Sequence, residues 1–222
     1  MSDICAVAII DDDDAVRDST ALFLTRSGFE TMSYGSGDEF LAADLPGNLG
    51  CILLDIRMPG TDGLAVMRIQ AEREVKVPAV VMTGHGDIPL AVEAMQLGAV
   101  DFLEKPCDPD ALVEAIRSAC EKSGQDSTSA AAVLAAQAKL AMLSDRQRET
   151  LRGVMKGQPN KVIAWELGLS TRTVESYRAD MLTRLGVRGT AQAVCLAVTA
   201  GFALNDPVRP RVETLPGEAL GR

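Results

Sequence analysis

Residues 5–14, CAVAIIDDDD, place a continuous apolar run directly before four aspartates. An apolar run without an alternating polar face is typical of a β-strand covered on both sides, as in a parallel sheet. Similar runs, and one weaker edge strand, follow along the chain: ETMSY at 30–34, CILL at 51–54, AVVM at 79–82 and AVDFL at 99–103. Helical patterns lie between them: 15–27, 63–74, 88–97 and 108–122. This alternation predicts an open α/β sheet with right-handed crossovers.

Acidic, hydroxyl and basic side chains follow the strongest of these strands. Asp11 and Asp12 follow the first run, and Asp55, Thr83 and Lys105 each come at or just beyond the end of a later one. Because ligands of open α/β sheets bind outside the carboxyl ends of the strands, we expect these side chains to meet in one crevice. Clustered carboxylates favour a cation among them, oxygen ligands favour Mg²⁺, and a carboxylate can attack phosphorus to form an aspartyl-phosphate. The pattern predicts magnesium-assisted phosphoryl chemistry, with Lys105 offsetting charge on the transferred group.

Four segments resemble the signature blocks of response-regulator receiver domains, in particular those of the FixJ type. They are IIDDDDAVRDS at 9–19, ILLDIRMPGTDGL at 52–64, VPAVVMTGHGDIPLAVEAM at 77–95 and GAVDFLEKP at 98–106. The resemblance spans about residues 4–122 and implies a flavodoxin-like (βα)5 fold. It also implies that Asp55 is the phospho-acceptor, that Asp11, Asp12, Asp55 and the backbone carbonyl of Arg57 hold Mg²⁺, and that Lys105 contacts the phosphoryl group.

The same resemblance implies a switch formed by Thr83 and Phe102, in which the aromatic ring repacks inward after phosphorylation. Many receivers have tyrosine where this chain has Phe102, so a switch that depends on a ring hydroxyl is excluded.

The Lys105–Pro106 bond is often cis in the family. Cys107 replaces a usual phenylalanine, and we interpret it as a small buried apolar residue. His85 lies between two glycines and is interpreted as part of a loop.

The charge of the chain is divided unevenly between its halves. Residues 1–122 carry 9 Lys/Arg and 22 Asp/Glu, a net charge of −13, whereas residues 123–222 carry 13 and 9, a net charge of +4. A small polar stretch, KSGQDSTSA at 122–130, separates them, and the alanine-rich stretch that follows favours a helix. We therefore predict a receiver at 1–122, a helical linker at 123–143, a second domain at 144–204 and a disordered tail at 205–222.

The second domain has the pattern of a helix-turn-helix unit. Ser144 and Gln147 form a capping box, and a short amphipathic helix at 161–167 is followed by Gly-Leu-Ser at 168–170 and a longer helix that ends near Leu185. The longer helix has an apolar face with helical spacing: Val174, Tyr177, Met181, Leu182 and Leu185. The apolar segment 191–200 suits either a core helix or a dimer interface, of which we favour the core helix.

The segments LSDRQRETL, NKVIAWELGLS and RTVESYRADMLTRLGV resemble the LuxR/NarL/FixJ type of DNA-binding domain. The resemblance implies a four-helix domain with a recognition helix at 171–185. Three of its side chains are expected to face bases, and Glu175 could accept from cytosine N4: Glu175, Ser176 and Ala179. Five others are expected to contact phosphates: Lys161, Thr171, Arg172, Thr173 and Arg178.

Composition excludes other classes of protein. The 222 residues are 47% hydrophobic and 24% charged, which is typical of globular chains and excludes a wholly disordered one. Neither a membrane span nor a signal peptide is evident, so we expect a cytoplasmic protein with no membrane partner. The five scattered cysteines lack paired spacing, which favours reduced thiols.

These features predict a response regulator that is not an enzyme beyond its own phosphotransfer and dephosphorylation. A sensor histidine kinase would phosphorylate Asp55, which would control homodimerisation and binding of double-stranded promoter DNA. Two alternatives stay open. The chain could bind DNA independently of phosphorylation, or Asp11 and Asp13 could serve as the nucleophile and acid/base of a haloacid-dehalogenase-like phosphatase.

Overall fold

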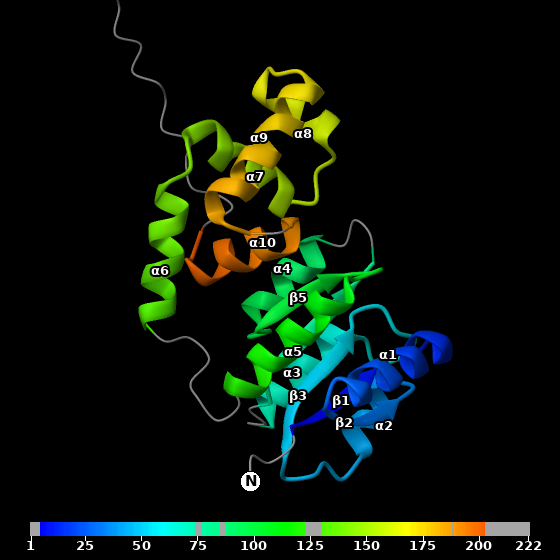
Figure 1. Ribbon diagram of the computed structural model, residues 1–222. Helices are drawn as coiled ribbons and strands as arrows, with labels where there is room; N and C mark the ends of the chain where they lie inside the picture. The colour runs from blue at the N-terminus through cyan, green and yellow to red at the C-terminus, as the bar shows by residue number, and fades with distance from the viewer. Residues whose placement is uncertain (1–4, 74–76, 85–87, 123–129, 188, 203–222) are drawn as a thin grey trace, which may run out of the picture.

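A computed structural model of the chain describes residues 5–73, 77–84, 88–122, 130–187 and 189–202. The predicted tail at 205–222 and His85 lie outside these residues. The described part consists of a sheet flanked by helices and, beyond it, a helical region (Figure 1). No helix among the described residues is long and apolar enough to cross a membrane.

The sheet has five parallel strands in the order β2-β1-β3-β4-β5, which confirms the predicted parallel α/β class. The strands are β1 (Ala6–Ile10), β2 (Glu30–Tyr34), β3 (Leu49–Asp55), β4 (Ala79–Thr83) and β5 (Asp101–Glu104). Every residue of β1, β3 and β4 is buried, because both faces of these central strands are covered. The predicted edge strand lies at the edge next to β1, where its residues retain partial exposure.

Helices cover the two faces of the sheet and divide its side chains into two cores. The helices are α1 (Asp14–Arg26), α2 (Gly37–Ala42), α3 (Gly63–Glu72), α4 (Ile88–Gln96) and α5 (Pro109–Lys122). Side chains of α1 and α5 pack with one set of alternating strand residues, and those of α2, α3 and α4 pack with the other set. The short helix α2 was not predicted from the sequence. Its first turn is capped by Ser36, whose hydroxyl accepts from Glu39 N at 3.1 Å.

The helical region begins within the predicted linker at 123–143, where its first helix forms. Its helices are α6 (Ala130–Ala141), α7 (Asp145–Met155), α8 (Asn160–Leu167), α9 (Thr171–Leu185) and α10 (Thr190–Thr199). The predicted capping box is present, because Ser144 N donates to Gln147 Oε1 and Gln147 N donates to Ser144 Oγ. Gly168 ends α8 with φ 65°, a left-handed conformation that glycine adopts without strain. The predicted bounds of the recognition helix agree with those of α9.

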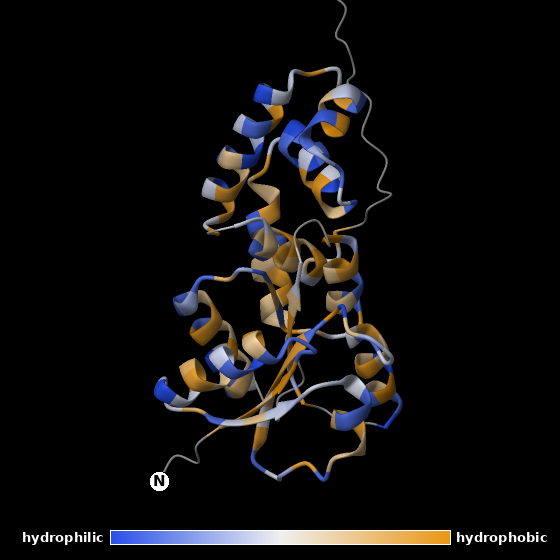
Figure 2. Cartoon of the chain, turned by 90° about the vertical axis from the view of Figure 1, so that its right-hand side faces the viewer, coloured by the Kyte–Doolittle hydropathy of each residue, from blue (hydrophilic) through white to orange (hydrophobic). Residues whose placement is uncertain are grey.

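Helix α10 joins the helical region to the sheet. Ala193, Val194 and Ala197 are fully buried, so the prediction of a core helix is confirmed. The helix also packs against α4 and β5, where Cys195 Sγ donates to Asp101 Oδ1 at 3.1 Å and lies 3.6 Å from Met95 Sδ. The hydrophobic core is therefore continuous from the sheet into the helical region, and Figure 2 shows hydrophobic residues at the junction.

The prediction that all cysteines are reduced is wrong for two of them. Cys5 and Cys120 form a disulfide across 115 residues of sequence. Their spacing gave no sign of the pairing, because only the folded sheet brings the start of β1 next to the end of α5. Cys51, Cys107 and Cys195 are free.

Candidate functional site

The carboxyl edge of the sheet gathers the side chains that the sequence singled out. Asp55 and Thr83 are the last residues of β3 and β4, whereas Asp11 and Lys105 directly follow β1 and β5. Lys105 Nζ lies 2.7 Å from Asp11 Oδ2 and 2.6 Å from Asp55 Oδ2, so one ammonium bridges two carboxylates. The site lies between β1 and β3, where the strand order reverses and α/β sheets bind their ligands.

Two carboxylates at this edge are buried, and the pKa values of Asp55 and Lys105 are shifted from their usual values. Asp11 is fully buried and Asp55 is 8% exposed. Burial raises the pKa of the Asp55 carboxyl, and the hydrogen bond and charge of Lys105 offset only part of that increase. Burial also acts to lower the pKa of Lys105, but its hydrogen bonds to Asp11 and Asp55 outweigh that effect and raise it. Asp55 is thus a partly desolvated carboxylate, and the Lys105 ammonium that contacts it stays protonated.

The donor atoms at this edge fit a hard divalent cation. Asp11, Asp12 and Asp55 each offer a carboxylate oxygen, and these oxygens lie within 4.8 Å of one another. Asp12 is exposed while the other two are buried, so one side of the cluster is open to solvent. An oxygen-only set with an open side matches the preference of Mg²⁺ for carboxylates together with retained water.

The loops that carry these carboxylates are fixed by contacts that the sequence did not single out. Arg17 Nη1 donates to Asp11 O at 2.7 Å, and the same guanidinium pairs with Asp14. A Cβ on Gly63 would overlap Asp55 O and lie 2.9 Å from Ile56 Cα, so only glycine lets α3 start this close to the end of β3. Both residues lie inside the quoted sequence blocks, but nothing in those blocks indicates which backbone atoms they touch.

Thr83 and Phe102 lie beneath this edge. The Thr83 hydroxyl is fully buried and has no hydrogen-bond partner among the described residues, which is costly unless the group meets a ligand. Phe102 is fully buried as well. The ring is therefore already packed inward in this structure, whereas the sequence-based switch expected it to move inward after phosphorylation.

The Lys105–Pro106 bond is cis, as is often the case in the family. Cys107 is only half-buried, against the expectation of a buried residue.

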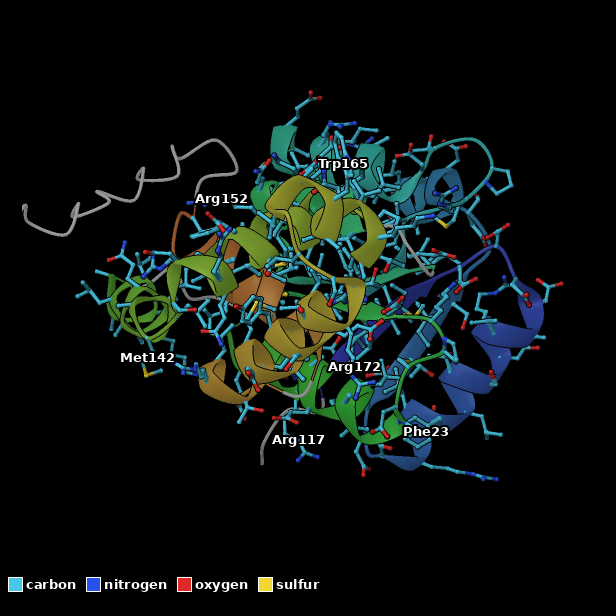
Figure 3. The ribbon with its side chains drawn as sticks, turned by 90° about the horizontal axis from the view of Figure 1, so that it is seen from above. Phe23, Arg117, Met142, Arg152, Trp165 and Arg172 are labelled. Atoms are coloured by element: carbon cyan, nitrogen blue, oxygen red, sulfur yellow. A yellow bond between two sulfur atoms is a disulfide. The ribbon has the colours of Figure 1, made fainter. Side chains whose placement is uncertain are left out.

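The predicted DNA-contacting face of α9 is open. Glu175, Ser176 and Ala179 are exposed, and so are Thr171 and Arg172 at the start of the helix. Figure 3, which looks down on the helical region, shows Arg172 well apart from Trp165 on α8. Lys161 is also exposed, and Thr173 is half-buried beside the capping residue Ser170.

Arg178 differs from the other predicted phosphate contacts. Its guanidinium donates to Asn160 Oδ1 at 2.7 Å and to Thr190 Oγ1 at 3.0 Å, which ties α9 to the starts of α8 and α10. The side chain is thus part of the internal structure of the helical region. Conversely, Trp165 is 82% exposed on α8, although the sequence pattern gave no reason to expect an exposed tryptophan there.

Comparisons with known proteins agree with this geometry in both halves. Residues 7–117 match the response regulator receiver domain, and residues 141–197 match the luxR family of bacterial regulatory proteins. The chain is 42% identical to the transcriptional regulatory protein FixJ of Azorhizobium caulinodans over 95% of its length and 100% of that protein. It is 43% identical to FixJ of Bradyrhizobium diazoefficiens over 90% of its length and 97% of that protein. Full-length FixJ from B. japonicum, solved by crystallography, matches with 40% identity and a TM-score of 0.52, covering 90% of this chain and 98% of that one.

These relatives span both halves of the chain, so the phosphatase alternative, which has no place for the helix-turn-helix, is set aside. The acidic triad Asp11, Asp12 and Asp55 is typical of the Mg²⁺ site of receivers. A receiver implies a histidine kinase as partner, and a LuxR-type helix-turn-helix implies binding to DNA. The chain belongs to the FixJ-type response regulators, as a transcription factor with a receiver domain and a LuxR-type DNA-binding domain rather than a catalytic enzyme.

Proposed function

We propose that a sensor histidine kinase phosphorylates Asp55 and that this modification controls homodimerisation and sequence-specific binding of promoter DNA. The observation that carries the proposal is the Lys105 ammonium, which contacts Asp11 Oδ2 and Asp55 Oδ2 next to a third carboxylate. An Asp55 oxygen would attack the phosphorus of a phosphohistidine, forming an O–P bond as the N–P bond breaks. Because the target is chromosomal DNA, we infer a cytoplasmic site of action.

Each neighbouring group has a role in this transfer. Arg57 N donates to Asp55 Oδ1 at 3.1 Å, which orients the carboxylate and leaves Oδ2 toward Lys105. The Lys105 ammonium, which contacts Asp55, would also contact the added phosphoryl oxygens and offset their negative charge. Bound Mg²⁺, held by Asp11, Asp12, Asp55 and the Arg57 carbonyl, would supply further charge neutralisation.

The unpartnered Thr83 hydroxyl supports a route from phosphorylation to the helical region. A phosphoryl oxygen would give this buried donor its missing partner, drawing the end of β4 toward Asp55. Helix α4 follows β4 along the chain, and α10 packs on α4 and β5. A shift there would weaken the α10 contact by population shift, freeing apolar surface through which two phosphorylated chains could pair.

On DNA, the exposed face of α9 would enter the major groove. Glu175, Ser176 and Ala179 would face bases, while Lys161, Thr171, Arg172 and Thr173 would contact phosphates. Arg178 would act indirectly, by fixing α9 relative to its neighbours.

The first test is intact-mass measurement after treatment with Mg²⁺ and a small phosphodonor. Wild type and Asp18→Asn, a control carboxylate exposed on α1, should each gain one phosphoryl group, whereas Asp55→Asn should gain none. Equal modification of Asp55→Asn would mean that another group is the acceptor.

The second test measures control of DNA binding. A site is first selected from randomised duplexes, and its affinity is then compared for phosphorylated and unmodified protein at fixed salt. We expect about 10-fold tighter binding and a dimer after phosphorylation. Equal affinity in both states would favour the alternative in which DNA binding is independent of phosphorylation.

A further inference from the structure

The Cys5–Cys120 pair lies at the edge of the sheet opposite the acidic cluster. Cys5 directly precedes β1, whose other end leads to Asp11, and Cys120 is in the last turn of α5. Their Cα atoms are 6.3 Å apart, within the range that a disulfide spans without backbone movement. The pair is therefore remote from the atoms that take part in phosphoryl transfer.

Other contacts hold both cysteines in position. The carbonyl of Cys5 accepts from Glu30 N at 3.2 Å, which fixes its backbone beside β2. On α5, Ile116 and Ala119 are fully buried against the sheet, which fixes the turn that carries Cys120. The bridge does not need to draw two separate segments together, since the fold already places the two sulfurs side by side.

Gly50 provides a second, independent observation. This glycine is buried within β3, and a Cβ at this position would overlap Cys5 Sγ and lie 3.6 Å from Cys120 Sγ. The space that a side chain would fill is thus occupied by the two sulfurs. Cys5 just before β1, Cys120 on α5 and the missing side chain at Gly50 on β3 together form one built site.

The free cysteines Cys51 and Cys195 have different surroundings. Cys51 is fully buried, and burial raises the pKa of its thiol to about 12. Burial and the nearby Asp101 raise the pKa of Cys195 well above the usual value. Cys5 and Cys120 are both half-buried and so lie nearer to solvent than Cys51, as does the free Cys107.

We propose that Cys5 and Cys120 form a reversible redox site whose co-reactant is a low-molecular-weight thiol–disulfide couple. In the oxidising direction, one cysteine thiolate attacks a sulfur of the small disulfide, forming a mixed disulfide and releasing one small thiol. The second cysteine thiolate then displaces the second small thiol and closes the bridge. The protein dithiol loses two electrons and two protons, and the small disulfide is reduced to two thiols.

The position of the bridge determines what it controls. It joins two residues 115 positions apart that lie at the start and the end of the receiver, so closing it restricts almost the whole unfolded receiver. It also fixes the end of α5, the last receiver helix before α6. Oxidation should therefore stabilise the receiver and leave phosphorylation of Asp55 unchanged.

The site is tested by equilibrating the full chain in glutathione buffers from fully reduced to fully oxidised. Free thiols are then alkylated under denaturing conditions and counted by intact mass. Of the five cysteines, five should be labelled in reduced buffer and three in oxidised buffer. Cys120→Ser should show four labels in reduced buffer and should form no internal bridge at any ratio. Its Cys5 can at most retain one small thiol as a mixed disulfide, which intact mass counts as a separate addition. The matched control Cys107→Ala should change from four labels to two.

Thermal unfolding of the same samples tests the consequence. Oxidation should raise the melting temperature of wild type and Cys107→Ala by on the order of 10 °C, with no change for Cys120→Ser. Modification of Asp55 by the small phosphodonor should be equal in both redox states. Five labels in fully oxidised buffer, a bridge that persists in fully reduced buffer, or equal melting temperatures would each overturn the proposal.

Discussion

The acidic edge of the sheet and the exposed face of α9 are both polar, but they are held in different ways. At the sheet edge, Asp11 and Asp55 are buried and bonded to Lys105 and to backbone groups. On α9, Glu175 and Ser176 are exposed, and no hydrogen bond or ion pair from another described residue holds their side chains. Chemistry at one phosphorus atom needs fixed atoms, whereas contacts to a DNA groove can adjust through side-chain rotation. The comparison indicates that substitutions at the edge should act through folding and geometry, and those on α9 through affinity.

The largest expected effect comes from removing the buried support of the acidic edge. Phe102→Ala should lower the free energy of unfolding by about 3–5 kcal/mol, because it leaves a cavity in the core shared with α10. Phe102→Leu should cost about 1 kcal/mol, since it retains most of the volume. Urea denaturation followed by circular dichroism would measure both. Near-equal losses in the two variants would mean that the core does not depend on the ring.

Arg178 and Arg172 provide the sharpest comparison within α9. Arg178→Ala should lower the free energy of unfolding by about 1.5–3 kcal/mol, because its charged hydrogen bonds to Asn160 and Thr190 are lost. Arg172→Ala should change it by less than about 0.5 kcal/mol and should reduce the salt dependence of DNA binding by about one charge. Denaturation and salt-titrated binding would measure the two effects. Equal stability of the two variants would contradict the internal role of Arg178.

Arg17 tests whether the acidic edge depends on its backbone support. Arg17→Ala should weaken Mg²⁺ binding about 10-fold, because Asp11 loses the guanidinium that holds its carbonyl. Arg26→Ala, an exposed arginine at the other end of α1, should leave the affinity unchanged. Mg²⁺ titration of the phosphorylation rate would compare them. An equal affinity in the two variants would mean that the loop positions Asp11 without Arg17.

The smallest expected effect concerns the charge of Asp55. Its pKa is raised in the folded protein, so folding favours the protonated form, and stability falls as pH rises from about 3.8, the ordinary value, through the raised value. Asp55→Asn carries no charge and should be more stable than wild type at pH 7. The difference should shrink as the pH is lowered toward 3.8. Denaturation across this pH range would measure it, and a difference that grows on acidification would reverse the sign that we assign.

Much of the fold could be predicted because burial determines the sequence pattern. Strands covered on both faces are continuous apolar runs, so β1 and β4 were placed within one residue at each end. The start of α9 followed from the capping residue Ser170, and its full range followed from the resemblance to LuxR-type domains. In the structure, Ser170 and Gly186 cap the two ends of the helix. The convergence of Asp11, Asp55 and Lys105 followed from the geometry of parallel strands alone.

What could not be predicted depends on contacts between distant segments. The bonds of Arg178 to two other helices, the disulfide between the ends of the receiver and the contact of Cys195 with Asp101 all join residues whose proximity only the tertiary fold creates. Helix α2 was missed because its six residues are too few to show a helical period. The inward position of Phe102 is a property of one conformation, and no sequence pattern specifies which conformation is present.

Packing of α10 on both halves has a consequence for cooperativity. Because one hydrophobic core continues from the sheet through α10 into the helical region, the two domains share buried surface that neither can expose alone without loss of stability. Calorimetry of the unmodified protein should then show a single unfolding transition, as for one cooperative unit. Weakening of the α10 contact should separate it into two transitions, so the number of calorimetric peaks becomes a direct readout of whether the domains are coupled.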